Sequence, residues 1–423
     1  MNRNYLRLAV CAITVLAFAS VAMAELEAVK TKTGTLEIGG VFQASFDYYI
    51  GSEQYQRNWV DLDGDGQVAD DGSENNIAYA MDRASDMKFH IRRARVVLKG
   101  TIIDDHVGYF LQTGLDNEKD LTVLDMRLAF SYVKYTTFSI GRFLPRFTYW
   151  APMSVAHLYL IDYPQMNTFI GVQRQTGFNI SFFHKYFEAD LALYNGRTEP
   201  NPSLNPADRA SAALGENTAD AWGDENTAKD LMLSVAMKPI DGLRIFGGYW
   251  HGTPLDYFEV DGGERTEHNA TVGIINAGAA YLTHYGLRLW GEWMSQNVAY
   301  DSATSADAET DRPDDTYEYS AMSYYLMGGF NFKNQGVPLE ILARYDYLDP
   351  DTENDDDTHP GSDKDIITHI TAGLNYYIQS NEAMLSLNYI YKNEEYELLD
   401  KKLKDDQTGI ANDVIKLQAQ LAF

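Results

Sequence analysis

From Leu36 to the end of the chain, apolar side chains recur at every second position in segments of about ten residues, the period of a β-strand whose two faces meet different surroundings. The clearest segment runs from Leu124 to Tyr132, where Leu, Met, Leu, Phe and Tyr share one face and Asp, Arg, Ala and Ser the other. The same alternation is found at residues 243–250, 287–294, 339–348, 369–377 and 383–392. The pattern predicts an all-β chain in which each strand has one apolar and one polar face.

The connections between these segments alternate in length. Short turns fall at residues 103–105, 134–135, 184–185, 239–242, 283–285, 333–336 and 380–381. Long polar connections lie at residues 51–86, 144–167, 195–229, 252–267, 297–319, 349–365 and 393–411, and only the one at 116–120 is brief. This rhythm is typical of a transmembrane antiparallel β-barrel, here of about 16 strands, with short periplasmic turns and long outer loops. A soluble β-sandwich has no physical reason to keep it.

Residues 1–24 have the features of a cleaved export signal. Arg3 and Arg7 precede an apolar run that ends in the small-residue site Ala22-Met23-Ala24, as in a secretory signal peptide. We therefore expect export and a mature barrel domain over residues 25–423. No window of the chain holds the roughly 20 consecutive apolar residues that a membrane-spanning helix needs.

The C-terminal segment from Ile415 alternates as a strand and ends on Phe423. Such an ending resembles the terminal signal of outer-membrane barrels, in which the last aromatic residue helps the barrel-assembly machinery to recognise the chain. As an ordinary edge strand it would expose a row of unpaired backbone groups, whereas pairing with the strand near Leu36 removes that edge. We therefore expect a closed barrel.

Composition narrows the classes of function. The chain has 61 acidic and 34 basic residues, a surplus that argues against nucleic-acid binding through phosphates. Its single cysteine, Cys11, lies within the export signal, so the mature chain has no disulfide or thiolate metal site. Aromatic residues make up 13% of the chain, including 29 tyrosines, which suits the aromatic girdles of a membrane barrel. The 9 histidines occur singly, with no phosphate loop, metalloprotease helix or nucleophile elbow, and we expect no enzyme activity.

Three stretches, in a consistent order, resemble one family of bacterial proteins. Phe89–Gly100 resembles the F-x-[IL]-R-R-A-R-[LV] strand of the phosphate-selective porin O/P family. Ser139–Phe147 is similar to the V-G-Q-F-K-x-P-F stretch of that family, and Arg174–Phe178 to its R-x-x-G-[VF] strand. Within the second stretch, Gly141-Arg142-Phe143-Leu144 departs from the family's Gln and Lys, so phosphate selectivity does not follow from the resemblance.

The resemblance implies a trimeric porin in the outer membrane of a Gram-negative bacterium, surrounded by lipid and lipopolysaccharide. It also implies that the third outer loop, residues 144–167, folds inward and narrows the channel. This loop is rich in aromatic and apolar side chains, which gain by leaving water. Packing at a subunit contact would satisfy them equally, so both interpretations stay open.

Basic residues at alternating positions are candidates for lining the pore: Arg92, Arg95, Arg127, Arg142, Arg174, Arg244, Arg288, Arg344 and Lys416. An arginine on the lipid face near the bilayer midplane costs roughly 2–4 kcal/mol, so we expect these side chains to face water. Acidic residues on the same faces are Asp125, Glu188, Asp190, Glu292, Glu340 and Asp346. The arginines therefore either pair with carboxylates and hold the wall in shape, or form a ladder that guides anions.

The first long loop, residues 51–86, contains a sequence that resembles an EF-hand calcium loop. The candidate ligands are Asp61, Asp63, Asp65, Gln67 and Asp71, with Gly66 at the sharp turn. Gly72 stands where the bidentate acid is usual, and no flanking helix is evident. The alternatives are a calcium site that orders an outer loop and a solvated acidic turn. No other cofactor is expected.

Taken together, the pattern predicts a channel for passive diffusion of small hydrophilic solutes or ions, which could include anions such as phosphate. Two other functions remain open. A non-conducting, sheath-like barrel that encloses a partner protein would need a wide and unobstructed lumen. An adhesin or receptor would act through its long loops and would show no conductance.

Overall fold

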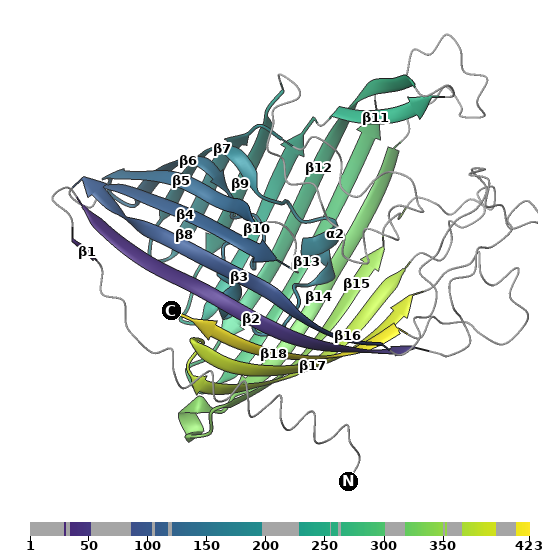
Figure 1. Ribbon diagram of the computed structural model, residues 1–423. Coiled ribbons are helices and arrows are strands. Elements are labelled where there is room, and N and C mark those ends of the chain that lie inside the picture. Colours follow the sequence, from purple (N-terminus) through teal and green to yellow (C-terminus); the bar gives the residue numbers. More distant parts are fainter. Residues whose placement is uncertain are drawn as a thin grey trace, which may run out of the picture.

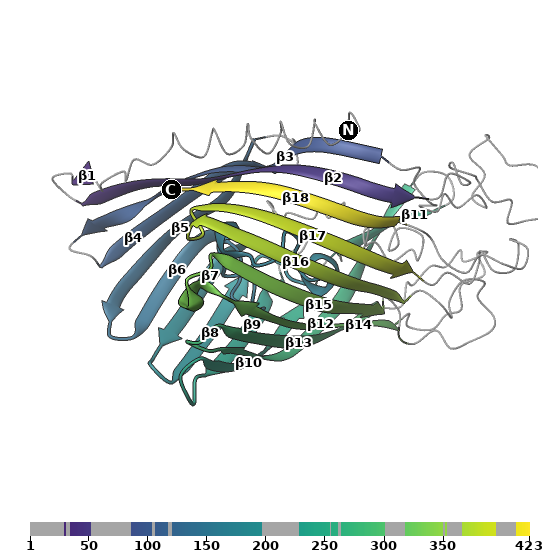
Figure 2. The same ribbon diagram turned by 90° about the horizontal axis from the view of Figure 1, so that it is seen from below.

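A computed structural model describes residues 29–30, 34–51, 86–103, 106–116, 121–196, 228–253, 255–260, 264–300, 318–349, 352, 366–394 and 412–423. These residues form one closed antiparallel barrel with long strands and two short helical segments inside it (Figures 1 and 2). The predicted export signal and the calcium-like sequence Asp61–Gly72 lie outside the described residues. Among the described residues, no helix is long and apolar enough to cross a membrane.

The strands follow one another along the chain. They are β1 (Val29–Lys30), β2 (Thr35–Gly51), β3 (Asp86–Ile103), β4 (Val107–Asp116), β5 (Thr122–Val133), β6 (Thr136–Phe143), β7 (Gln175–Phe183), β8 (Phe187–Tyr194), β9 (Asp230–Met237), β10 (Leu243–Gly252), β11 (Leu255–Val260), β12 (Glu264–Leu282), β13 (Leu287–Tyr300), β14 (Glu318–Asn331), β15 (Leu339–Asp349), β16 (Ile367–Gln379), β17 (Ala383–Glu394) and β18 (Asn412–Ala422). The helical segments are η1 (Val155–His157) and α2 (Gln165–Phe169) between β6 and β7, and η2 (Lys333–Gln335) between β14 and β15.

Each strand of the ring pairs with its neighbour in the chain, and β18 pairs with β2 to close it. β1 and β11 extend the edges of β2 and β12 without entering the ring, so the described barrel has 16 strands. At the seam the backbone of Phe423 donates to Gly40 O over 3.1 Å, and Gly40 N donates to Phe423 O over 2.9 Å. The predicted fold class and the pairing of the last strand with the first are confirmed.

The two faces of each strand have opposite environments, as the alternation predicted. In β9 the outward side chains of Leu231, Leu233 and Val235 are 40%, 47% and 42% exposed, while the inward Met232 is fully buried. An outer face of this kind is stable only against lipid, because apolar side chains on it would be hydrated in water. The turns at 134–135, 184–186, 240–242, 284–286 and 380–382 lie at one end of the barrel, called here the short-turn end, together with Phe423.

The alternation fails at one position of β5 that the sequence placed on the lipid face. Gln112 is opposite Asp125 and Thr113 is opposite Val123, so Leu124 is an extra residue in a β-bulge. Leu124 is consequently buried, whereas Met126 and Leu128 beyond the bulge are exposed on the outer face. A bulge shifts the side-chain alternation by one residue, which a strict period of two cannot foresee.

Candidate functional site

Residues 144–174 leave β6 at the end opposite the short turns and run inside the barrel before β7 begins (Figure 1). We call this segment the inner loop; it extends beyond the predicted range of 144–167. Its apolar side chains form a buried cluster with the inward face of the wall, in which Trp150, Met166 and Ile170 are at most 2% exposed. The cluster explains why a loop with this composition lies inside the barrel, since its apolar surface leaves water there.

Inward-facing amide side chains of the wall hold the backbone of the inner loop. Asn276 of β12 donates to Phe147 O over 2.7 Å, Asn375 of β16 donates to Tyr159 O over 2.7 Å, and Gln420 of β18 donates to Ala156 O over 2.9 Å. Asn388 of β17 accepts from Ile161 N over 2.8 Å. A loop with little regular structure leaves its backbone groups without partners, and these side chains supply them.

Trp150 is the centre of the aromatic contacts between the inner loop and the wall. Its indole Nε1 donates to the hydroxyl of Tyr325 on β14 over 2.8 Å. Its ring lies 5.9 Å from that of Trp290 on β13 and 5.8 Å from that of Tyr159, measured between ring centroids. On β16, Gly373 leaves room for the inner loop, because a Cβ atom at this position would lie 2.3 Å from Leu160 Cδ2.

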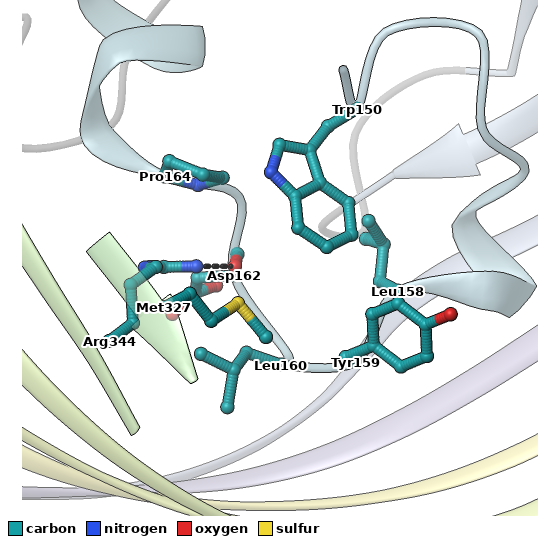
Figure 3. Close-up of a pocket in the computed structure, with 8 residues that line it drawn as sticks. All are labelled: Trp150, Leu158, Tyr159, Leu160, Asp162, Pro164, Met327 and Arg344. Carbon is teal, nitrogen blue, oxygen red and sulfur yellow. Dashed lines mark hydrogen bonds between the residues drawn. The ribbon is translucent and has the colours of Figure 1, made fainter. Parts of the chain in front are cut away.

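A small pocket lies between the inner loop and strands β14 and β15 (Figure 3). It is lined by Trp150, Leu158, Tyr159, Leu160, Asp162, Pro164, Met327 and Arg344. In Figure 3, Arg344 points toward the backbone of Asp162, and its guanidinium donates to Asp162 O over 2.9 Å and to Tyr163 O over 3.1 Å. The pocket therefore lies within the contact between the inner loop and the barrel wall.

Asp162 ties the inner loop to the seam of the barrel. Its carboxylate accepts from Arg92 of β3 and from Lys416 of β18, the latter over 2.8 Å. Burial alone would raise the pKa of Asp162, but the charges of Arg92 and Lys416 outweigh that effect and lower the pKa well below its usual value. The carboxylate therefore stays ionised, and Lys416 also lies 3.7 Å from Asp47 of β2.

A second β-bulge decides which arginines of β3 reach the lumen. Gln43 is opposite Arg93 and Ala44 is opposite Ile91, so Arg92 is the extra residue. The predicted pore residues Arg92 and Arg95 both face inward, and so does Arg93, which is 7% exposed and was not among the predicted residues. Under strict alternation, Arg93 and Arg95 would face one side of the sheet and Arg92 the other. Because the bulge adds one residue at Arg92, all three side chains face the lumen.

Most of the predicted basic residues are held by carboxylates of the wall. Arg95 Nε lies 3.0 Å from Asp116, Arg174 lies 3.2 Å from Asp125, Arg244 lies 3.1 Å from Glu188, Arg288 lies 3.0 Å from Glu340, and Arg344 lies 2.6 Å from Asp346. For these residues the structure shows the first of the two alternatives, in which each guanidinium pairs with an acid and fixes the wall. Arg142 is inward and buried on β6.

Two inward arginines differ from the rest. Arg127 of β5 lies 5.7 Å from the ring centroid of Phe110 and 5.6 Å from that of Phe143. Arg93 donates to Gln43 Oε1 over 2.9 Å and lies 5.8 Å from the ring centroid of Tyr163. Neither forms an ion pair with any residue that the structure describes. Their charges are therefore less compensated than those of the paired arginines.

Sequence reasoning also missed Arg146, at the start of the inner loop. Its guanidinium lies 3.3 Å from Asp190 and 3.5 Å from Glu188, both on β8, and 4.8 Å from the ring centroid of Phe183. Arg146 is part of the stretch Ser139–Phe147 that carried the family resemblance, which was the available signal. On the side of the lumen formed by β3 to β6, Arg93, Arg95, Arg127 and Arg142 face inward together with Asp116 and Asp125, so arginines outnumber acids there.

A closed barrel of this strand number with an inner loop has the architecture of porins, and solved porins match it along their full length. The outer membrane channel DcaP of Acinetobacter baumannii is 12% identical with a TM-score of 0.59, and the match covers 94% of this chain and 100% of that one. An anion-selective porin from Comamonas acidovorans is 14% identical with a TM-score of 0.58, covering 92% and 100%. OmpT of Vibrio cholerae, folded in vitro, is 12% identical with a TM-score of 0.54, covering 94% and 100%.

The family model described as phosphate-selective porin O and P matches residues 262–423. This match confirms the resemblance over the C-terminal part of the chain, from just before β12 to the end. The three stretches that first indicated the family, between residues 89 and 178, precede the matched range. No curated protein sequence matches the chain.

Proposed function

We propose that the protein is a passive channel of a Gram-negative outer membrane that conducts small hydrophilic solutes with a preference for anions. In this proposal the cleaved signal directs export, the barrel-assembly machinery inserts the chain with the help of Phe423, and three copies assemble in a bilayer of phospholipid and lipopolysaccharide. The solved trimeric form of OmpT from Vibrio cholerae shares the fold at 11% identity and a TM-score of 0.54. The protein acts as a pore and not as an enzyme.

The observation that carries this proposal is the inward-folded loop beside a wall rich in arginine. The inner loop packs on the wall from β9 round to β2, so it narrows the lumen and leaves the arginine-rich side of β3, β5 and β6 as the complementary surface. Ion preference is set by the electrostatic potential at the narrowest part of a pore. Arg93 and Arg127, which are not neutralised by an ion pair with a described residue, favour anions there.

The net charge of −27 does not oppose this preference. Many of the acidic residues, such as Asp355-Asp356-Asp357, belong to the long connections in the sequence and not to the strands that form the wall. The sheath alternative is disfavoured, because the inner loop occupies the interior that an enclosed partner protein would need.

Single-channel recording under a salt gradient tests the proposal. The reversal potential should show anion preference, and conductance steps should come in groups of three. The double variant Arg93→Gln with Arg127→Gln should reduce the ratio of anion to cation permeability. One unit charge about 5 Å from the ion contributes about 1 kcal/mol at an effective dielectric constant of about 60, or about fivefold for each arginine.

Lys333→Gln is the matched control, because Lys333 lies in η2 outside the lumen and its loss removes one positive charge. Its permeability ratio should equal that of the wild type. A correctly folded barrel without conductance would remove the channel proposal and favour the sheath or receptor function. A conducting barrel whose ion preference ignores Arg93 and Arg127 would remove only the assignment of selectivity to these residues.

A further inference from the structure

Two neighbouring turns at the short-turn end have the same dipeptide. Lys134-Tyr135 joins β5 to β6, and Lys185-Tyr186 joins β7 to β8. In each turn the lysine ammonium lies over the ring of the tyrosine that follows it, at 4.8 Å from the centroid in the first turn and 5.0 Å in the second. A cation held over an aromatic face keeps its charge available, because the ring does not neutralise it as a carboxylate would.

The two turns form one continuous surface. Phe183 N donates to Tyr135 O over 2.8 Å, which joins the first turn to the start of the second. The ring of His184 then lies 5.3 Å from that of Tyr135 and 5.9 Å from that of Tyr186, measured between centroids. We call Lys134, Tyr135, His184, Lys185 and Tyr186 together the lysine-tyrosine surface.

This surface is exposed, and its lysines have no acidic partner within the described part of the chain. Tyr135 is 46% exposed and Tyr186 is 55% exposed. Among the residues that the structure describes, neither lysine forms an ion pair, whereas Lys238 in the next turn is bound by Glu188. Of the other turns at this end, the one after β9 has Asp241 as well as Lys238, and the one before β4 has Asp104 and Asp105 in its sequence.

The lysine-tyrosine surface also lies where the apolar outer face of the barrel ends. Tyr132 of β5 is 59% exposed, and Phe187 and Leu191 of β8 are 38% and 47% exposed on the outer face just beyond the turns. Tyrosine rings and the long stems of lysines favour such a boundary, because both have an apolar body and a polar end. The ring hydroxyls and the ammonium groups are then at the depth of lipid headgroups.

We propose that the lysine-tyrosine surface binds the headgroup of an anionic phospholipid in the leaflet at the short-turn end. The headgroup phosphate is placed between the ammonium groups of Lys134 and Lys185, and the acyl chains follow the apolar side chains of β5 to β8. The occupant is a membrane lipid, because the charged groups continue directly into the exposed apolar side chains of the outer face, such as Phe187 and Leu191, which suit acyl chains. This site is independent of the lumen and of the proposed channel function.

Native mass spectrometry of the purified oligomer tests the proposal. The protein is equilibrated at low salt with micelles that contain phosphatidylglycerol, phosphatidylcholine with the same acyl chains, or glycerol 3-phosphate without chains. The wild type should retain phosphatidylglycerol in preference to the other two. The variant Lys134→Gln with Lys185→Gln should weaken this retention by about 30-fold, since one lysine near an anionic surface contributes about fivefold.

Lys333→Gln serves as the matched control, because it removes an exposed lysine from another turn at the same end of the barrel. It should retain phosphatidylglycerol as the wild type does. Equal retention by the double variant and the wild type would overturn the proposal, as would an equal loss in Lys333→Gln. Binding of glycerol 3-phosphate as tight as that of phosphatidylglycerol would assign the lysines to free phosphate esters. A change in oligomer stability in lipid-free detergent would assign the surface to a subunit contact. The heat-dependent gel mobility of each variant reports whether its barrel is folded.

Discussion

The attachment of the inner loop to the barrel seam through Asp162 can be tested by one substitution. Asp162→Asn keeps the size of the side chain and removes the charge that Arg92 and Lys416 share. After this change, Lys416 retains Asp47 at 3.7 Å, but Arg92 loses its carboxylate. The inner loop should then detach more often, because the hydrogen bonds that remain around its tip, with Arg344 and Asn388 among others, involve backbone groups and no second ion pair.

The magnitude follows from the exposure of the three side chains. Breaking a fully buried ion pair by removing one partner costs about 3–5 kcal/mol. Here the side chain of Asp162 is 25% exposed and those of Arg92 and Lys416 are 13% exposed, so water replaces part of the lost interaction. We therefore expect a loss of about 2 kcal/mol in the free energy of docking of the loop, which raises the undocked population about 30-fold.

Single-channel recordings measure that population as the fraction of time at a second conductance level. Asp116→Asn is the matched control, since Asp116 pairs with Arg95 and its loss removes the same lumenal charge without touching the inner loop. The reasoning is refuted if Asp162→Asn changes neither the fraction of time at the second conductance level nor the thermal stability. It is also refuted if Asp116→Asn changes that fraction as much as Asp162→Asn does.

The ion pairs of Asp162 with Arg92 and Lys416 also predict how docking of the inner loop depends on pH. The pKa of Asp162 is lowered in the folded protein from its reference value of 3.8, so its contribution is fully present above that value. It is lost only as the pH falls through the lower folded pKa. Docking through Asp162 should therefore be constant from about pH 5 upward, and a loss of the main conductance level near neutral pH in the wild type would contradict this assignment.

Three further predictions concern other parts of the chain. Trp150→Ala should destabilise the inner loop by about 3–5 kcal/mol, because the indole is 2% exposed and bonded to Tyr325, and limited proteolysis of refolded barrels should show faster cleavage of the loop. Phe423→Ala should reduce the amount of barrel in the outer membrane, and normal insertion would contradict the role of Phe423 in assembly. The refolded variant should melt within a few degrees of the wild type, because Phe423 is 60% exposed. The EF-hand-like sequence, which lies outside the described residues, predicts that calorimetry detects calcium binding in the wild type and none in Asp63→Asn; equal heats would identify a solvated acidic turn.

The sequence by itself determined the strand pattern, the two faces of the wall and the closure at Phe423. These features depend on a period of two and on the requirement that every backbone group in a membrane has a partner, and both can be recognised in single segments such as Leu124–Tyr132. The inward direction of Arg127, Arg244 and Arg288 follows from the same period, since an arginine on the lipid face is costly.

Only the tertiary structure decided which charges are compensated and where the inner loop lies. Two β-bulges, at Arg92 and at Leu124, shift the alternation by one residue and thereby bring Arg93 into the lumen and bury Leu124. The partners of Asp162 come from β3 and β18, which lie at opposite ends of the chain and meet only when the barrel closes. A bulge and an ion pair across the lumen are set by contacts between distant segments, and no local pattern of hydrophobic and polar residues encodes them.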